Sequence, residues 1–396
     1  MRSYIMVRVT NLLRVSIFAM LLPAMCSSIL SCRKMPEFIK STTTSVTDGS
    51  LTGSIKGFYL LNEGNMGSNK ATLDYFDYQS GVYTKNIFAE RNPGVVKELG
   101  DVGNDLQIYG NKLYAVINCS HFVEVMDAQT AKHITQISIP NCRYITFKER
   151  FAYVSSYAGP VELDPNSRLG YVAKIDTLTL KVVDSCVVGY QPEQMIIVGS
   201  KMYVANSGGY RAPNYDTRVS VIDLNSFKVI KNIEVGINLH RLAKDRWGNI
   251  YVSSRGDYYN TPSMTYVIDS NTDSVESLPL LPNSDMAICG DSLYIYSAQW
   301  NYLTNRNTID YAIYNLEEKR VVTRSFIKEG AEKQIKTPYG IALNPESGEI
   351  FVADAKDYVT PGSLYCFDRS GRLKWSVTTG DVPAHIAFTT KPLKPL

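Results

Sequence analysis

Residues 219–236 read VSVIDLNSFKVIKNIEVG, in which two strand-like runs flank a polar turn. Related phrases recur at six other places in the 396-residue chain. Each turn opens with a short polar residue: Asp77, Asp127, Asp176, Asp223, Asp269, Asn315 and Asp368. A carboxylate or amide one carbon from the backbone can accept the amide hydrogens of its own turn. These seven residues are therefore predicted to form turns and not a catalytic set.

A second phrase alternates with the first and carries an aromatic residue at a fixed place. These aromatic anchors are Tyr59, Tyr114, Tyr153, Tyr203, Tyr251, Tyr294 and Phe351. Another strand-like run precedes each phrase except the first, and the C-terminal segment PAHIAF (383–388) supplies the missing run. Four short antiparallel strands per unit, repeated seven times and closed by the last strand, predict an all-β, seven-bladed β-propeller over residues 57–390. Such a ring leaves no exposed sheet edge at its seam.

The N-terminus has the pattern of an export signal. Arg2, Arg8 and Arg14 precede a short apolar run at 15–25 that is too short to span a bilayer as a stable helix. The run leads to ILSC, which resembles a lipobox, so residues 1–31 are predicted to be a lipoprotein signal peptide and Cys32 the lipidated residue. The alternative is an ordinary secretory signal or an uncleaved anchor. Residues 32–56 are polar and are predicted to be a flexible tether.

Charge and cysteine usage exclude several classes of protein. Removing the three arginines of the signal from the 41 basic residues leaves 38, which equals the number of acidic residues. No nucleic-acid surface is indicated, and membrane association is expected through the lipid alone. The five cysteines that follow Cys32 are widely spaced and form no C-x-x-C pair, so neither a zinc site nor a disulfide framework is predicted.

The connections of the predicted blades differ between the two faces of the ring. In an antiparallel blade, the first and third turns share one face, while the second connection and the link to the next blade share the other. The first and third turns are short, whereas most second connections are long and rich in Tyr, Trp, Asn and Arg, a composition suited to recognition. The predicted ligand-binding residues are Tyr157, Asn206, Tyr210, Arg211, Tyr215, Arg255, Tyr258, Tyr259, Gln299, Trp300, Tyr302, Tyr358, His240 and His385.

The sequence predicts a binding protein rather than an enzyme. It contains no G-x-S-x-G elbow and no histidine pair at metal-ligand spacing, so no catalytic residue, metal ligand or cofactor is predicted. Other polar residues expected at the channel mouth are Arg143, Glu193, Gln194, Arg241, Asp285 and Tyr339. The enzyme alternative is a lactonase- or lyase-like propeller, in which Ca²⁺ is held by oxygen ligands from Glu63, Asn104, Asp105, Asn206 and Asp354.

The segment MYVANSGG (202–209), followed by the phrase at 219–236, resembles the YVTN-type repeat of YncE-like bacterial propellers. The resemblance covers residues 57–388. It implies the propeller fold and says little about chemistry, because these repeats encode blades.

A lipoprotein signal joined to such a propeller is similar to the surface lipoproteins that Gram-negative gut bacteria place beside TonB-dependent transporters. The BtuG-type branch captures cobalamin and passes it to its transporter. The resemblance implies an outer-membrane lipoprotein at the cell surface that binds a corrinoid as ligand and has a TonB-dependent transporter as partner. Surface lipoproteins of this group often carry acidic residues after the lipidated cysteine, whereas this chain reads CRKMPEF (32–38), which leaves a periplasm-facing orientation open. A third alternative is a protein-interaction platform without a small ligand.

Overall fold

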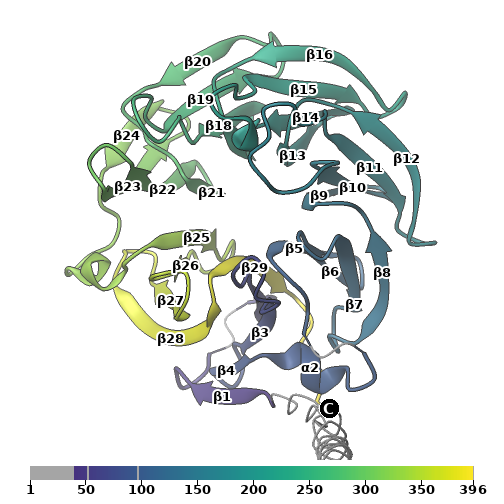
Figure 1. Cartoon of the computed structure of the whole chain (residues 1–396). Coiled ribbons are helices and arrows are strands. Elements are labelled where there is room, and N and C mark those ends of the chain that lie inside the picture. The colour runs from purple at the N-terminus through teal and green to yellow at the C-terminus, as the bar shows by residue number, and fades with distance from the viewer. Residues whose placement is uncertain (1–39, 51–52, 96–97, 396) are drawn as a thin grey trace, which may run out of the picture. The chain divides into compact units, whose positions relative to one another are not determined.

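The computed structural model describes residues 40–50, 53–95 and 98–395. These residues form seven antiparallel sheets, or blades, arranged around a central axis (Figure 1). The seven-bladed propeller predicted from the repeats is thus confirmed. The first three blades contain β1 (Thr42–Ser45), β2 (Gly57–Asn62), β3 (Thr72–Asp77), β4 (Val82–Lys85) and β29 (Pro383–Thr389) in blade 1; β5 (Gly103–Tyr109), β6 (Lys112–Ile117), β7 (Phe122–Asp127) and β8 (His133–Ser138) in blade 2; and β9 (Cys142–Lys148), β10 (Phe151–Ser156), β11 (Tyr171–Asp176) and β12 (Lys181–Val187) in blade 3.

The other four blades follow in chain order around the ring. They contain β13 (Pro192–Val198), β14 (Lys201–Asn206), β15 (Arg218–Asp223) and β16 (Lys228–Glu234) in blade 4; β17 (Leu239–Lys244), β18 (Asn249–Ser254), β19 (Met264–Asp269) and β20 (Val275–Leu278) in blade 5; β21 (Asp285–Cys289), β22 (Ser292–Asn301), β23 (Arg306–Asn315) and β24 (Arg320–Thr323) in blade 6; and β25 (Pro338–Leu343), β26 (Ile350–Asp354), β27 (Pro361–Phe367) and β28 (Leu373–Asp381) in blade 7. In the part of the chain that the structure describes, three short helical segments lie in connections: α2 (Ile87–Arg91), η1 (Gly209–Arg211) and η2 (Ala331–Gln334).

The ring is closed by strands from opposite ends of the propeller. β29 pairs antiparallel with β2, with Gly57 opposite Thr389 and Leu61 opposite His385. The innermost strands of neighbouring blades also contact one another around the axis, including β29 with β5 and with β25. The C-terminal segment therefore completes blade 1, as the repeat pattern predicted.

The aromatic anchors fasten each blade to the next one. Tyr114 of blade 2 packs among residues of blade 3, and Tyr203 of blade 4 packs among residues of blade 5. The Tyr59 hydroxyl donates a hydrogen bond of 2.9 Å to the carbonyl of Ala128 in blade 2. Six of the anchors are buried and Tyr294 is half-buried. The regular aromatic of the repeat thus supplies the apolar contact between blades.

The seven short polar residues form the predicted turns. Asp127 shows the arrangement: its Oδ1 accepts hydrogen bonds from the amides of Gln129 and Thr130, both at 3.0 Å, and from the Thr130 hydroxyl at 2.9 Å. The other six turn openers likewise accept amide hydrogens from residues within their own turns. The turn thus needs an acceptor oxygen close to its own backbone. Asp and Asn both meet this need, because each carries its side-chain oxygen one carbon beyond Cβ.

We expect Asp127→Ala to lower the free energy of unfolding by about 1 kcal/mol, because the turn amides lose their acceptor. Asp127→Asn keeps an acceptor oxygen at the same place and should remain close to wild type. Urea unfolding followed by circular dichroism measures both variants. An equal loss in the two variants would show that charge, and not the hydrogen bonds, matters at this turn.

The predicted tether needs a correction. Residues 42–45 lie within it, yet they form β1, which pairs antiparallel with β4 at the outer edge of blade 1. All four side chains of β1 are exposed. Backbone hydrogen bonds to an open strand edge require no apolar side chain, so the polar composition gave no sign of this strand. The predicted signal peptide and Cys32 lie outside the described residues.

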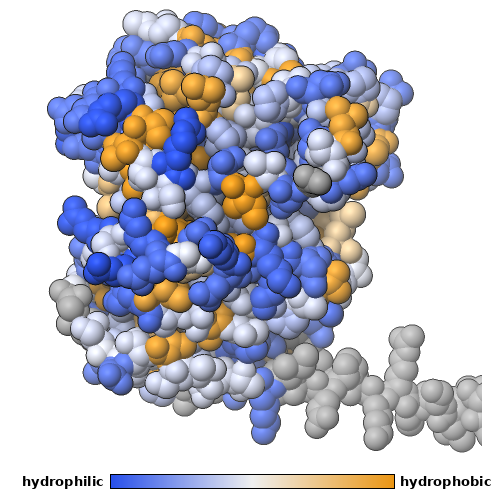
Figure 2. Space-filling model, turned by 90° about the vertical axis from the view of Figure 1, so that its left-hand side faces the viewer, coloured by the Kyte–Doolittle hydropathy of each residue, from blue (hydrophilic) through white to orange (hydrophobic). Residues whose placement is uncertain are grey.

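One side of the propeller has a largely polar surface (Figure 2). Figure 2 shows the side that lies on the left in Figure 1, where hydrophilic side chains separate small hydrophobic patches. None of the described helices combines the length and the apolar character that crossing a bilayer requires.

Candidate functional site

A cavity of about 940 Å³ opens on one face of the propeller, around the axis. Its lining comes from all seven blades, through the connections between second and third strands and through the first residues of the innermost strands. These are the two classes of segment that antiparallel geometry assigns to the same face. The cavity therefore lies on the face where the sequence places its long, individual loops.

Aromatic side chains form much of the cavity wall. All eight aromatic residues of the predicted binding set line it, together with Tyr144, Tyr296 and Tyr339. Several of them contact one another: the rings of Tyr259 and Tyr302 are stacked with centroids 5.2 Å apart, and Trp300 meets Tyr302 edge-on at 6.3 Å. Trp300 remains 42% exposed and Tyr302 55%. These exposed rings can still bury apolar surface against a ligand.

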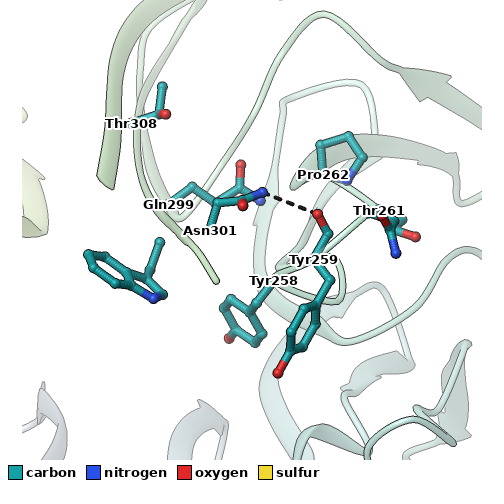
Figure 3. Close-up of a pocket in the computed structure, with 9 residues that line it drawn as sticks. Tyr258, Tyr259, Thr261, Pro262, Gln299, Asn301 and Thr308 are labelled. Atoms are coloured by element: carbon teal, nitrogen blue, oxygen red, sulfur yellow. Dashed lines mark hydrogen bonds between the residues drawn. The ribbon is translucent and has the colours of Figure 1, made fainter. Parts of the chain in front are cut away.

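A smaller pocket of about 110 Å³ adjoins this wall between the β18–β19 loop and the β22–β23 hairpin (Figure 3). Two hydrogen bonds hold the loop against the hairpin: Asn301 Nδ2 donates to the Tyr259 carbonyl and the Tyr302 amide donates to the Tyr258 carbonyl, both at 3.1 Å. Asp257 Oδ1 accepts three amides of the same loop, from Tyr259, Asn260 and Thr261. The loop is thus fixed in place by its own hydrogen bonds, which presents Tyr258 and Tyr259 in a defined arrangement.

A buried ion network occupies the floor of the cavity. The Glu193 carboxylate, on β13, accepts hydrogen bonds from Arg143 Nη2 and from Arg255 Nη1, both at 3.0 Å. The Tyr157 hydroxyl donates to the same carboxylate at 2.6 Å. The Glu193 side chain has no exposed surface, whereas both arginines line the cavity. Residues of three successive blades, 3, 4 and 5, therefore meet at one carboxylate.

Two further polar groups extend this floor around the axis. The Tyr144 hydroxyl and His240 Nε2 lie 2.8 Å apart, and the Arg241 guanidinium lies 5.0 Å from the centroid of the Tyr144 ring. Arg241 Nε lies 3.3 Å from Asp285 Oδ1. On the blade 1 and blade 7 side, Glu63 accepts a hydrogen bond from the Tyr339 hydroxyl at 2.8 Å and lies 3.1 Å from His385 Nε2.

Burial and charge set the protonation of this network. Burial alone would raise the pKa of Glu193, but the positive charges of Arg143 and Arg255 reverse this effect and hold the pKa below its ordinary value. Burial lowers the pKa of His240 well below its ordinary value, and Arg255 and Arg241 lower it further. Burial raises the pKa of Tyr144 to about 12. At neutral pH, Glu193 is therefore ionised while His240 and Tyr144 are neutral.

The structure brings together eleven of the fourteen predicted binding residues at the cavity, including Arg255, Gln299 and His240. Three lie elsewhere. Asn206 is fully buried; its oxygen accepts the Gly189 amide and its nitrogen donates to the Arg218 carbonyl. Arg211 lies over the Tyr190 ring at 3.6 Å and bonds to the Pro165 carbonyl. His385 contacts Glu63 beside the cavity.

The oxygen ligands of the calcium alternative are mostly used within the protein. Asp105 accepts the amides of Leu106 and Ile145, and Asp354 accepts those of Thr337 and Lys356. Of the five predicted ligands, only Glu63 and Asn104 line the cavity. Within the described residues no group of three or more His, Cys, Asp or Glu is placed to hold a metal ion. The present arrangement therefore does not gather the proposed calcium ligands.

The binding set drawn from the sequence omitted several residues of the site. Arg143, Arg241 and Tyr339 were expected at the channel mouth and do line the cavity, whereas Tyr144 and Tyr296 were not singled out. Tyr144 is the third residue of β9, inside a run with the ordinary alternation of a strand. The innermost strands carry polar or aromatic residues near their starts, and this pattern could have identified Tyr144 as a residue of the site.

Comparisons with known proteins agree with the fold. The sequence matches the family described as "Domain of unknown function (DUF5074)" over residues 56–386. A search of curated proteins gave no match. Among solved structures, a hypothetical selenium-binding protein from Sulfolobus tokodaii aligns with a TM-score of 0.60 and 11% identity, covering 85% of this chain and 94% of that one.

Two structures from Bacteroides are also similar. A protein of Bacteroides fragilis with the provisional name 6-phosphogluconolactonase aligns with a TM-score of 0.57 and 12% identity, covering 86% of this chain and 100% of that one. A quinonprotein alcohol dehydrogenase-like protein of Bacteroides thetaiotaomicron aligns with a TM-score of 0.54 and 17% identity, covering 85% and 78%. At these identities the similarities show the fold alone, and enzymatic activity is not excluded.

Proposed function

Because the chain belongs to the family described as "Domain of unknown function (DUF5074)", we propose its function from the geometry of the cavity: the protein binds a bulky ligand with a flat, partly apolar surface and a polar rim. The observation that supports this proposal is the convergence of eleven aromatic side chains on one cavity of about 940 Å³ above a buried polar floor. Cavities of this size with aromatic walls and a few placed polar groups are typical of small-molecule sites.

The chemistry of the lining suits such a ligand. Tyr and Trp offer large contact areas with few rotatable bonds, so little conformational entropy is lost on binding. Amide side chains of Asn104, Asn238 and Gln299 lie among the rings. The hydrogen bonds that fix the Tyr258 loop reduce the cost of ordering it around the ligand.

The finer part of the proposal concerns the ligand and the cell. We propose a corrinoid such as cobalamin as the first ligand to test, because it combines a wide ring with an amide-bearing rim. In this proposal Cys32 carries the lipid anchor, the protein lies on the outer membrane with its cavity facing outward, and a TonB-dependent transporter receives the ligand. The resemblance of the repeats and of the lipobox supports these points.

A desalting experiment tests the ligand. The chain from Lys40 onward, which retains β1, is mixed with cyanocobalamin and passed through a desalting column, and corrinoid absorbance is read in the protein fraction. Co-elution at about one equivalent per chain is the expected result. Absence of corrinoid from the protein fraction would overturn the corrinoid proposal and leave the cavity for another ligand of the same shape.

Trp300 offers a matched pair of variants. We expect Trp300→Ala to weaken corrinoid binding by about tenfold to a hundredfold, because a large apolar contact is lost. Trp247 is equally exposed, at 41% against 42%, but it lies in the first turn of blade 5 on the opposite face. Trp247→Ala should therefore bind as the wild type does. Equal losses in the two variants, measured by equilibrium titration, would contradict a site on the loop face.

A further inference from the structure

More positively charged than negatively charged side chains line the cavity. Arg143, Arg241 and Arg255 line it, whereas Glu63 is the one carboxylate among the lining residues that the structure describes. The acid that pairs with Arg143 and Arg255 lies behind them, because Glu193 has no exposed side-chain surface. Asp285 is different: its side chain is 15% exposed, against 8% for its partner Arg241. A ligand entering the cavity therefore meets the guanidinium groups of Arg143 and Arg255 before it meets Glu193.

The group around Glu193 has more positive than negative charge. One carboxylate is shared by two arginines, Arg143 through Oε2 and Arg255 through Oε1. Although burial opposes both effects, the two arginines hold the pKa of Glu193 below its ordinary value and Glu193 holds the pKa of each arginine above its ordinary value. All three groups are therefore ionised, and the triad carries a net positive charge. Tyr157 adds a neutral donor to the same carboxylate. An anion beside Arg255 would balance this charge.

Two of the arginines also have donors to spare. Arg241 Nε is buried and has no hydrogen-bond partner among the described residues, since its 3.3 Å approach to Asp285 lacks hydrogen-bond geometry. Within the same part of the chain, Arg255 donates one side-chain hydrogen bond, from Nη1 to Glu193. Because Arg241 Nε faces Asp285, the donors that a ligand acceptor can reach are the other guanidinium N–H groups of Arg241 and Arg255, and both side chains line the cavity.

The three arginines belong to one neighbourhood. Arg143 is joined to Arg255 through Glu193, and both Arg143 and Arg241 lie near the Tyr144 ring, with 5.8 and 5.0 Å to its centroid. His240, which is neutral, bonds to Tyr144 in the same place. Glu63 is engaged with Tyr339 and His385 on the blade 1 and blade 7 side, across the axis from blades 4 and 5.

We infer that Arg143, Arg241 and Arg255 form an anion subsite at the floor of the cavity that receives a phosphoryl group carried by the ligand. Guanidinium groups present planar sets of N–H donors that match phosphate oxygens, and several arginines around one point suit a group with several oxygens better than a carboxylate. The inference deepens the proposed function, on which it rests, by giving the bulky ligand an anionic end.

Inorganic phosphate is the probe for this subsite. Purified full-length protein is titrated with phosphate at constant ionic strength, with sodium chloride as the balancing salt, and binding is followed by calorimetry and by ³¹P line broadening. We expect saturable binding of phosphate, and none of acetate over the same range. Failure of the wild-type protein to bind phosphate saturably would overturn the subsite, and saturation by acetate alone would overturn its phosphoryl class.

Variants locate the binding. Arg255→Gln leaves Arg143 paired with Glu193 but removes the excess charge, and it should weaken phosphate binding by about tenfold to a hundredfold. Arg255→Lys keeps the charge and should lose less. Arg246→Gln, on the opposite face, removes an exposed arginine and should bind as the wild type does. Unchanged binding in Arg255→Gln overturns the assignment, and if that variant does not fold, Arg255→Lys must still bind more weakly than wild type.

The two proposals fail separately. Phosphate binding without corrinoid co-elution keeps the anion subsite and discards the corrinoid. Corrinoid co-elution without saturable phosphate binding keeps the bulky ligand and discards the subsite.

Discussion

Glu193→Ala will lower the free energy of unfolding by about 3–5 kcal/mol, the range for removing one partner from a buried ion pair. The substitution leaves Arg143 and Arg255 at the cavity floor without the carboxylate that both of them bond, and it also removes the acceptor of the Tyr157 hydroxyl. The cost comes mainly from positive charge that remains buried without compensation. Urea unfolding of the two proteins at pH 7 measures the difference.

Two variants separate this effect from general destabilisation. Glu276→Ala removes an exposed acidic side chain from the outermost strand of blade 5 and should stay close to wild type. Glu193→Gln keeps the shape of the side chain and one acceptor oxygen but loses the charge. Its free energy of unfolding should therefore fall between those of Glu276→Ala and Glu193→Ala. A loss below about 1 kcal/mol in Glu193→Ala, the range of an exposed ion pair, would show that water compensates the arginines and that the network is not buried in solution.

The pH dependence of Glu193 has a definite sign. Because Arg143 and Arg255 hold its folded-state pKa below the value of about 4.3 in an unfolded chain, its contribution is fully present above that value. The contribution is lost as the pH falls through the folded-state pKa. The stability difference between wild type and Glu193→Gln should therefore be constant near pH 7 and shrink only in acid.

The fold was predictable because its determinants are local and repeated. The turn opened by Asp127 and the anchor Tyr114 each act within one blade or against the next, and each has six equivalents along the chain. β1 escaped prediction since it is held by backbone hydrogen bonds, and its four side chains are exposed. A strand of this kind leaves no apolar pattern to detect.

The site was predictable only in part, because its residues meet across blades. Loop composition identified Tyr258, which lies in the β18–β19 loop, and Trp300, which the structure places near the end of β22. The contacts of Arg143 and Arg255 with Glu193 join residues 50 and 62 positions apart in the chain, and the sequence does not reveal which inner-strand residues face one another. Asn206 shows the reverse case: this polar residue at a loop edge is used inside the protein, by backbone groups and by the Ser220 hydroxyl.

Removing residues 382–396 will abolish cooperative folding of the propeller, the largest effect we expect from any single change. The truncation deletes β29 and leaves one edge of β2 unpaired, while the other edge keeps its pairing with β3. It also removes the contacts that β29 makes with β5 and β25, so blades 2 and 7 lose the element that joins them. An open strand edge of this kind also templates aggregation. We expect loss of the sigmoidal thermal transition in circular dichroism and elution as aggregate in gel filtration.

A shorter truncation distinguishes ring closure from the loss of a tail. Removing residues 392–396 keeps all of β29. It removes the packing of the half-buried Leu393 against the core of blades 1 and 2, and the hydrogen bond from the Lys394 amide to the Gln129 carbonyl. This chain should unfold cooperatively, with a modest decrease in its transition temperature. A peptide of residues 382–396, added to the longer truncation, should restore part of the transition, because the β2 edge that it pairs with is otherwise complete. A cooperative transition at the wild-type temperature in the longer truncation would show instead that six complete blades and the β2–β4 sheet hold the ring without closure by β29.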